Sequence, residues 1–219
     1  MMSTPNRIVL GITGASGSVY AIRLLQVLVK AGHETHLVVS PSGAAVHKQE
    51  CGLELNLKKP DVESMVCCTP GWSQAAPLVD AETVTAAISS QRLCYHQHDD
   101  YMTPIASGSF RTHAMVVCPC SGSTLSGIAR AASTNLIQRA ADVHLKEHRK
   151  LVLVPRETPL SVIQLENMQR LAASGAVILP AMPGWYHGVK SLDCLVDFIV
   201  SRILDQLDID NTLMNRWGE

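Results

Sequence analysis

Two loops built of small and hydroxyl-bearing residues have the composition of phosphate-binding loops. They span residues 13–17 (TGASG) and 119–124 (PCSGST), and each follows an apolar run and leads into a helix-like segment. Small side chains let backbone N–H groups approach an anion, and a helix N-terminus attracts negative charge. One such loop can also be a plain tight turn. In an open parallel sheet, however, both loops would lie at the carboxyl ends of strands, where they could converge on one phosphate-bearing ligand.

The spacing of the glycines favours a mononucleotide over a dinucleotide. Gly11, Gly14 and Gly17 do not match the G-x-G-x-x-G pattern that binds the pyrophosphate of NAD. The second apolar run ends at Val39 and is followed by Ser40, where an acidic residue that binds the ribose would be expected. Two phosphate-type loops without that acidic residue indicate a ligand such as FMN.

The elements that must position these loops alternate between strands and helices. Runs rich in valine, isoleucine and leucine, typical of parallel strands buried on both faces, occupy residues 8–12, 36–39, 115–118, 151–154 and 176–179. Helices are predicted at residues 18–30, 134–150, 159–173 and 191–207, and Ser40 is a candidate N-cap before Pro41. The alternation predicts an α/β fold of the Rossmann or flavodoxin-like type, in which helices cover both faces of a doubly wound parallel sheet.

Residues 52–100 interrupt this alternation. They contain Pro60, Pro70 and Pro77 and show weak periodicity, apart from a plausible helix at residues 81–89. A chain of 219 residues is short for two typical domains. We therefore expect one domain over residues 1–219, with an elaborated segment at 52–100 and a short tail at 208–219.

The composition argues against several classes of protein. Hydrophobic residues make up 47% of the chain and charged residues only 17%, which suggests surface buried between subunits. A net charge of −1 provides no basic field for nucleic acid. We expect no signal peptide and no helix that spans a membrane. The seven scattered cysteines are typical of reduced thiols in a cytoplasmic protein.

No metal site is expected from the histidine and cysteine pairs. His96 and His98 are two positions apart, and so are Cys118 and Cys120. Paired zinc ligands usually have wider spacings than these. The acidic residues 99–100 lack the further carboxylate of an aspartate-rich site that holds Mg²⁺ and a pyrophosphate.

Longer motifs make the chain similar to a known family. The motifs are GITGASG (11–17), SGSF (107–110), PCS (119–121), RAADV-x-LKE (139–147), LVLVPRETPL (151–160), LENM (165–168), ILPA (178–181) and WYH (185–187). Together they resemble the UbiX flavin prenyltransferase family over nearly the whole chain apart from residues 52–100. The RAADV-x-LKE and VPRE runs are the most specific of them.

The resemblance implies a flavodoxin-like subunit that binds FMN and attaches to it a dimethylallyl group from dimethylallyl monophosphate. The product, prenylated FMN, would serve a UbiD-type decarboxylase in ubiquinone biosynthesis or in the decarboxylation of aromatic acids. The resemblance further implies a homododecamer with active sites at subunit junctions. Breaking the allylic C–O bond leaves a phosphate with close to two negative charges, so cations and hydroxyl donors must surround it in a pocket that excludes water. A metal-independent reaction fits this chemistry.

Position by position, the resemblance assigns site residues. The FMN contacts are Gly14, Ala15, Ser16, Ser40, Ser121, Gly122, Ser123, Thr124 and Arg156, and the prenyl-phosphate contacts are Ser107, Arg139, Lys146, Tyr186 and Arg202. Glu50 and Glu157 fall in the acid/base positions, where a carboxylate could move a proton at the flavin or at the leaving oxygen. Ser16 is counted with them as catalytic.

Four positions depart from the family pattern. Tyr101 stands where tryptophan is frequent, Ala131 where glycine is common, Gln164 in place of a histidine, and Val189 in place of a proline. Tyr101 and Ala131 could alter the fit of the prenyl group or flavin. Tyr101, Trp185 and Trp217 are also candidates for stacking on these groups.

Two alternatives remain open. An FMN-dependent cysteine decarboxylase shares the fold but carries PASANT and PAMN motifs, where this chain has PCSGST (119–124) and PAMP (180–183). A non-catalytic flavin-binding subunit would also keep the fold. The joint presence of Glu50, Lys146, Glu157 and Arg202 argues against that second alternative.

Overall fold

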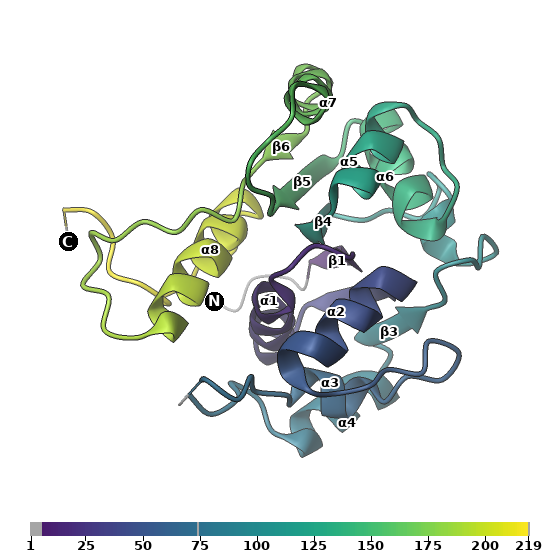
Figure 1. The fold of residues 1–219 in the computed structure, drawn as a ribbon. Helices are drawn as coiled ribbons and strands as arrows, with labels where there is room; N and C mark the ends of the chain where they lie inside the picture. Colours follow the sequence, from purple (N-terminus) through teal and green to yellow (C-terminus); the bar gives the residue numbers. More distant parts are fainter. Residues whose placement is uncertain (1–5, 74, 219) are drawn as a thin grey trace.

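A six-stranded parallel sheet lies at the centre of the computed structural model, which describes residues 6–73 and 75–218 (Figure 1). The strand order is β3-β2-β1-β4-β5-β6, and every neighbouring pair is parallel. The strands are β1 (Arg7–Ile12), β2 (Glu34–Val39), β3 (Leu93–His96), β4 (Ala114–Cys120), β5 (Lys150–Pro155) and β6 (Val177–Ile178). The predicted doubly wound α/β fold is therefore confirmed.

Helices cover both faces of the sheet. They are α1 (Ser18–Lys30), α2 (Pro41–Cys51), α3 (Val62–Val66), α4 (Ala81–Ser89), α5 (Gly122–Ala129), α6 (Leu136–Lys146), α7 (Val162–Ala173) and α8 (Leu192–Gln206). Successive side chains of a strand point to opposite faces. Ile8 and Leu10 of β1 accordingly pack in the core with α1 and α8, whereas Val9 packs in a second core with α5 and α6. Helices α6 and α8 thus lie on opposite faces of the sheet.

Most of the predicted elements are confirmed, with differences at their ends. Helix α1 has the predicted bounds, and α8 differs from its prediction by one residue at each end. The helix predicted at 134–150 ends at Lys146, because His148 adopts a left-handed φ of 53° and Lys150 already begins β5. The helix predicted at 159–173 begins only at Val162, since Ser161 caps it in a capping box.

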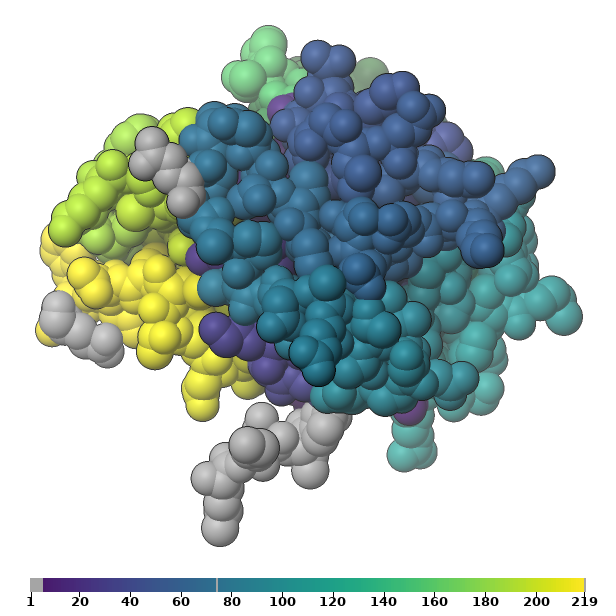
Figure 2. Space-filling view, turned by 90° about the horizontal axis from the view of Figure 1, so that it is seen from below, coloured from purple at the N-terminus to yellow at the C-terminus, as the bar shows by residue number. Residues whose placement is uncertain are grey.

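The segment at residues 52–100 joins the core of the molecule. It supplies the confirmed helix α4 and two elements that were not predicted, α3 and the edge strand β3, in which only Leu93 is fully buried. Met65 and Val84 of this segment pack in the same core as α1. Seen from below in Figure 2, the segment (blue) borders the C-terminal residues (yellow). None of the helices in the described ranges is both long and apolar enough to cross a membrane.

The strand order places a crevice at the carboxyl ends of β1 and β4. From β1 the chain builds the sheet outward through β2 and β3, and it then returns to the other side of β1 with β4. The connections after β1 and β4 therefore leave the sheet in opposite directions. Open α/β sheets bind ligands at such a switch point. The loops at residues 13–17 and 119–124 both lie there.

Candidate active site

Backbone and side-chain hydrogen bonds tie the two predicted phosphate loops together. The Thr13 N–H and hydroxyl both donate to the Pro119 carbonyl, at 3.2 and 2.7 Å. The Ser121 N–H in turn donates to the Thr13 hydroxyl, at 2.8 Å. The Ser40 N–H donates to the Ile12 carbonyl, at 2.9 Å, which adds the loop after β2. The prediction that the loops converge on one crevice is confirmed, and Thr13, the first residue of the 13–17 loop, makes the hydrogen bonds that join the two loops.

Three helices begin at this crevice. Ser40 caps α2 by accepting the Gly43 N–H, and Ser121 caps α5 by accepting the Thr124 N–H. Helix α1 begins one residue after Gly17. A side chain at Gly14 would place its Cβ 2.4 Å from the Ser42 Cβ, so the loop approaches α2 more closely than other residues allow. Helix N-termini around a side-chain-free loop form an anion-binding site.

Glu50 closes one end of this crevice. Both of its carboxylate oxygens accept the Gly17 N–H at 3.0 Å, and one of them accepts the Ser18 N–H at 2.8 Å. The N-cap residue of α1 is Gly17, which has no side chain to cap the helix, so the Glu50 carboxylate accepts the first N–H groups of α1 instead. Glu50 thus comes from the last turn of α2 but lies against the start of α1.

Arg156 and Ser16 lie beside Glu50 in one pocket. The Arg156 Nε donates to the Ser16 carbonyl, at 3.1 Å. The pocket has a volume of about 410 Å³, and Tyr20 and Trp72 also line it. Burial raises the pKa of the Tyr20 hydroxyl, and the neighbouring Cys118 raises it further to a smaller extent. Trp72 is a lining residue that sequence reasoning missed, because residues 52–100 carried no family motif.

An adjoining pocket contains Glu157. It shares Arg156 and Ala181 with the first pocket, and Trp185 lines it as well. The Glu157 carboxylate accepts the Thr158 N–H, at 3.1 Å, and is exposed. The two predicted acid/base residues therefore border two pockets that Arg156 also lines.

Ser107, Arg139 and Lys146 form a second group of predicted site residues. Arg139 and Lys146 lie seven residues apart on α6, which places them on the same helix face. The Arg139 Nε donates to the Ala106 carbonyl at 3.0 Å, next to Ser107. The Lys146 Nζ lies close to Gly108, since a Cβ added at this glycine would be 3.0 Å from the nitrogen. The α6 cations therefore flank the loop that carries the Ser107 hydroxyl.

Tyr186 and Arg202 lie elsewhere in the chain. The Tyr186 ring packs edge to face against Trp217, with 5.2 Å between centroids. Arg202, on α8, forms an ion pair with Asp205 at 2.7 Å. The structure thus does not bring Arg202 together with Arg139 in one chain, because α8 and α6 cover opposite faces of the sheet. The expected ring of positive groups is divided into two parts within a single subunit.

The structure shows the surroundings of three of the departures from the family pattern. Ala131 adopts a left-handed φ of 50°, a conformation in which glycine is favoured. The Tyr101 hydroxyl donates to the Ser133 carbonyl at 3.0 Å, and its ring is exposed. Gln164 lies beside the start of α5, with its Nε2 3.0 Å from where a Cβ on Gly122 would be. Glu219, the last residue of the predicted tail, lies outside the described residues.

The fold and the loops at its switch point define a flavodoxin-like nucleotide-binding protein. The family model described as Flavoprotein matches residues 1–204. The flavin prenyltransferase UbiX of Halalkalibacterium halodurans is 46% identical over 95% of this chain and 92% of its own. That of Pseudomonas aeruginosa is 47% identical over 100% of this chain and 97% of its own. The chain belongs to the UbiX flavin prenyltransferase family.

Solved structures agree with this assignment. AnUbiX (PadA1), crystallised in complex with FMN and dimethylallyl pyrophosphate, has a TM-score of 0.77 and 36% identity and covers 99% of both chains. A dodecameric FMN-dependent UbiX-like decarboxylase from Escherichia coli O157:H7 has a TM-score of 0.77 and 37% identity, covering 97% of this chain and 100% of its own. The cysteine decarboxylase TvaF, at 16% identity and a TM-score of 0.52, shares only the fold.

Proposed function

We propose that the chain transfers a dimethylallyl group from dimethylallyl phosphate to reduced FMN and releases prenylated FMN for a UbiD-type decarboxylase. The observation that carries the proposal is the crevice in which α1, α2 and α5 begin around Gly14, in a member of this enzyme family. A relative of similar structure was crystallised with FMN and dimethylallyl pyrophosphate. A reducing cytoplasm remains the expected location, and all seven cysteines are free.

FMN would bind across the loops at the switch point. The backbone N–H groups of Gly14, Ala15 and Ser16 would donate to the flavin phosphate, and Ser40 caps the start of α2 beside them. On the other side, the flavin contacts would come from Ser121, Gly122, Ser123 and Thr124 at the start of α5. Arg156 already contacts the 13–17 loop through the Ser16 carbonyl, so its guanidinium lies beside the same ligand.

The prenyl phosphate would be held by cations that now have acidic partners. Lys146 pairs with Glu147 at 2.7 Å and Arg139 with Asp142 at 3.3 Å. Such half-exposed pairs contribute little stability, about 0–1 kcal/mol. A phosphate with close to two negative charges can therefore take over these cations and the Ser107 hydroxyl at small cost. Their positive charge would stabilise the negative charge that develops on the leaving group.

Tyr186 and Arg202 would be contributed by other copies of the chain. Since α8 and α6 cover opposite faces of one subunit, Arg202 and Lys146 can reach one phosphate only across a subunit junction. The aromatic side chains of Trp185, Tyr186 and Trp217 are 70%, 52% and 80% exposed, as expected for surface that a partner covers. We propose a homododecamer on this basis, because the UbiX-like protein of Escherichia coli O157:H7 is dodecameric.

Glu50 and Glu157 would handle protons. Each borders a pocket that Arg156 also lines. One can accept or return a proton at the flavin, and one can protonate the leaving phosphate oxygen. Ser16 lies in the pocket with Glu50 and is proposed to assist there. The aromatic and apolar lining would keep water from the allylic cation.

Anaerobic incubation with reduced FMN and dimethylallyl phosphate tests this function. The flavin recovered from the protein should be heavier by one prenyl group in its mass spectrum. A reaction without donor and one with oxidised FMN serve as controls, and both should return FMN of unchanged mass. Unmodified flavin in the complete reaction would contradict the proposal. Parallel reactions with the mono- and diphosphate donors identify the substrate that the enzyme uses.

A further inference from the structure

Three side chains with metal-binding atoms converge outside the proposed active site. They are His47 and Cys51 of α2 and Cys68, which follows α3. His47 and Cys51 are four residues apart, so they lie on the same face of the helix. One ligand atom from each residue lies within 4.8 Å of the other two, a convergence found once among the described residues.

The His47 ring has no hydrogen-bond partner among the described residues. The residue is 1% exposed, and neither ring nitrogen has a hydrogen-bond partner in the part of the chain that the structure describes. Buried polar groups in folded proteins are normally hydrogen-bonded, and an orphaned one requires an explanation. The Cys68 thiol contacts the Cys51 carbonyl oxygen at 3.6 Å and the Cys51 thiol, so the two sulfur atoms are neighbours. An imidazole without a partner, next to two thiols, is the arrangement that a metal ion would satisfy.

We propose that His47, Cys51 and Cys68 bind one zinc ion, with water as the fourth ligand. Two thiolates and one imidazole form a ligand set typical of zinc. In a tetrahedral zinc site with Zn–S bonds of about 2.3 Å, the ligand atoms are roughly 3.5–3.8 Å apart. The observed separations of up to 4.8 Å need a closure of about 1 Å. Both cysteines are partly exposed, which leaves a path for the ion and for the water ligand.

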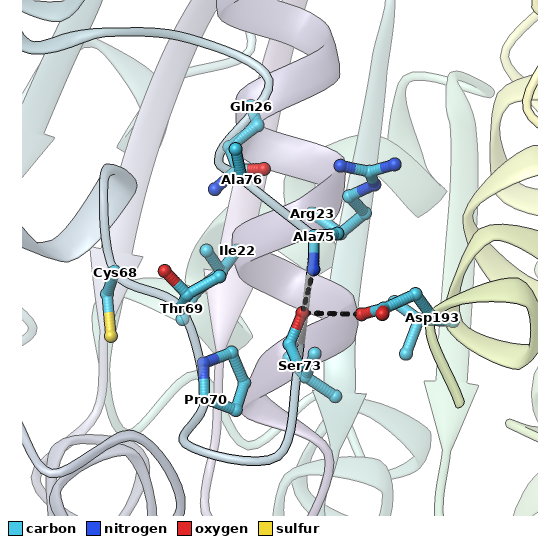
Figure 3. A pocket seen from close by; sticks show the side chains of 12 residues that line it. Ile22, Arg23, Gln26, Cys68, Thr69, Pro70, Ser73, Ala75, Ala76 and Asp193 are labelled. Atoms are coloured by element: carbon cyan, nitrogen blue, oxygen red, sulfur yellow. Dashed lines mark hydrogen bonds between the residues drawn. The ribbon is translucent and has the colours of Figure 1, made fainter. Parts of the chain in front are cut away.

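The zinc ion would join two segments that shape the proposed flavin pocket. On one side, Cys51 follows Glu50, whose carboxylate holds the start of α1. On the other side, Cys68 begins the loop that carries Pro70 and Trp72 into the pocket lining. Figure 3 shows Cys68 and Pro70 on this loop. The same loop is tied to α8 further along, through the Ser73 hydroxyl and Asp193.

The ion would therefore act as a positioning group for the pocket rather than as a participant in prenyl transfer. Its binding does not depend on the proposed reaction. Two thiols would each lose a proton as the metal binds, so uptake should release protons. Metal content can thus be measured whether or not the protein is an active transferase.

Metal titration of the full-length protein, reduced with a phosphine, tests the site. We expect one zinc ion per chain after gel filtration. Cobalt in place of zinc should give a thiolate-to-cobalt charge-transfer band and the intense visible bands of a tetrahedral site. Cys68→Ser and Cys51→Ser should weaken binding by more than about 100-fold, since loss of outer partners alone costs 10- to 100-fold. His47→Asn should alter the visible cobalt bands and keep the charge-transfer band.

Cys67→Ser is the matched control. Cys67 is the adjacent residue, is also partly exposed and lies outside the cluster, so this variant should bind zinc as the parent protein does. Absence of zinc uptake by the reduced protein would overturn the proposal. Equal loss in the Cys67→Ser and Cys68→Ser variants, with both still folded by circular dichroism, would overturn it too. A Cys51–Cys68 disulfide that forms in air, with no zinc uptake after its reduction, would assign the pair to redox chemistry instead.

Discussion

Replacing Gly14 with alanine should damage flavin binding through the shape of the crevice. The added Cβ would lie 2.4 Å from the Ser42 Cβ and 3.3 Å from the Ser42 carbonyl carbon. Carbon atoms in contact are about 3.5–4.0 Å apart, so the first turn of α2 must move by about 1 Å or more. Because the clash is with a Cβ and the backbone, no rotamer change can relieve it. The start of α2 would therefore move relative to the loop at residues 13–17.

The size of the effect follows from this displacement. Overpacking of this kind costs about 1–3 kcal/mol. If that cost must be met when FMN draws the two segments together, the dissociation constant for FMN rises by about 5- to 150-fold. Titration of FMN, followed by its fluorescence, measures the dissociation constant, and a melting curve of the apoprotein reports any loss of stability.

Gly71→Ala is the control for this experiment. A Cβ at Gly71 meets no atom within 4 Å, and its φ is not left-handed, so the variant should bind FMN as the parent does. An FMN affinity of Gly14→Ala within twofold of the parent value would refute the argument that this loop and α2 form the flavin phosphate site. Equal weakening in both variants would refute it as well.

Three further predictions concern the cations, a strained residue and a buried histidine. Lys146→Ala should lower kcat/KM for dimethylallyl phosphate by about 100-fold or more while FMN affinity stays within twofold. Glu147→Ala, which frees the lysine and also removes a 3.9 Å ion pair with Arg149, should not lower kcat/KM. Equal losses of donor use and FMN binding in Lys146→Ala would mean that the lysine is assigned to the wrong phosphate. Ala131→Gly should leave the free energy of unfolding unchanged or raise it by up to about 1 kcal/mol, because glycine adopts a left-handed φ without strain. The control Ala132→Gly, at a position without a left-handed φ, should lower the free energy of unfolding. Denaturant titration measures both values, and a loss of more than about 1 kcal/mol in Ala131→Gly would contradict the proposed strain. Burial lowers the pKa of His144 to about 4 from its ordinary value near 6.5, so its neutral form contributes stability that is complete above pH 6.5 and is lost as the pH falls toward 4. Denaturant unfolding between pH 6.5 and 4 should show that His144→Gln loses less free energy of unfolding on acidification than the parent, by up to about 3 kcal/mol. The same dependence of the free energy of unfolding on pH in both proteins would contradict this contribution.

The sequence was informative where burial and local chemistry agree. The strands of the sheet interior read as continuous apolar runs because both of their faces are covered, and Ser40 was a visible N-cap. Strand β3 lacked that signal, since it is an edge strand whose side chains are mostly part-exposed. The end of α6 depends on the left-handed backbone at His148, which residue type alone does not reveal.

The arrangement of the candidate site was harder to predict. Arg139 and Lys146 were assigned from the family resemblance, although their spacing of seven residues in a helix already places them on one face. Which face of the sheet each helix covers is decided by chain crossovers, so the separation of Arg202 from the α6 cations was not visible. The pairing of His47 with Cys51 had a usable signal in its helical i, i+4 spacing, but Cys68 joins them only through tertiary packing.

Mixed oligomers of two inactive variants test most directly whether the phosphate-binding cations come from different copies. Lys146→Ala and Arg202→Ala chains with different tags are co-expressed in equal amounts, and assemblies that carry both tags are assayed for prenylated FMN. If the two residues of one site belong to different copies, about a quarter of the sites regain both, and the activity rises to about a quarter of the parent value. If both residues of each site come from the same copy, no mixed assembly restores a complete site, and activity no higher than that of the separate variants would contradict the account.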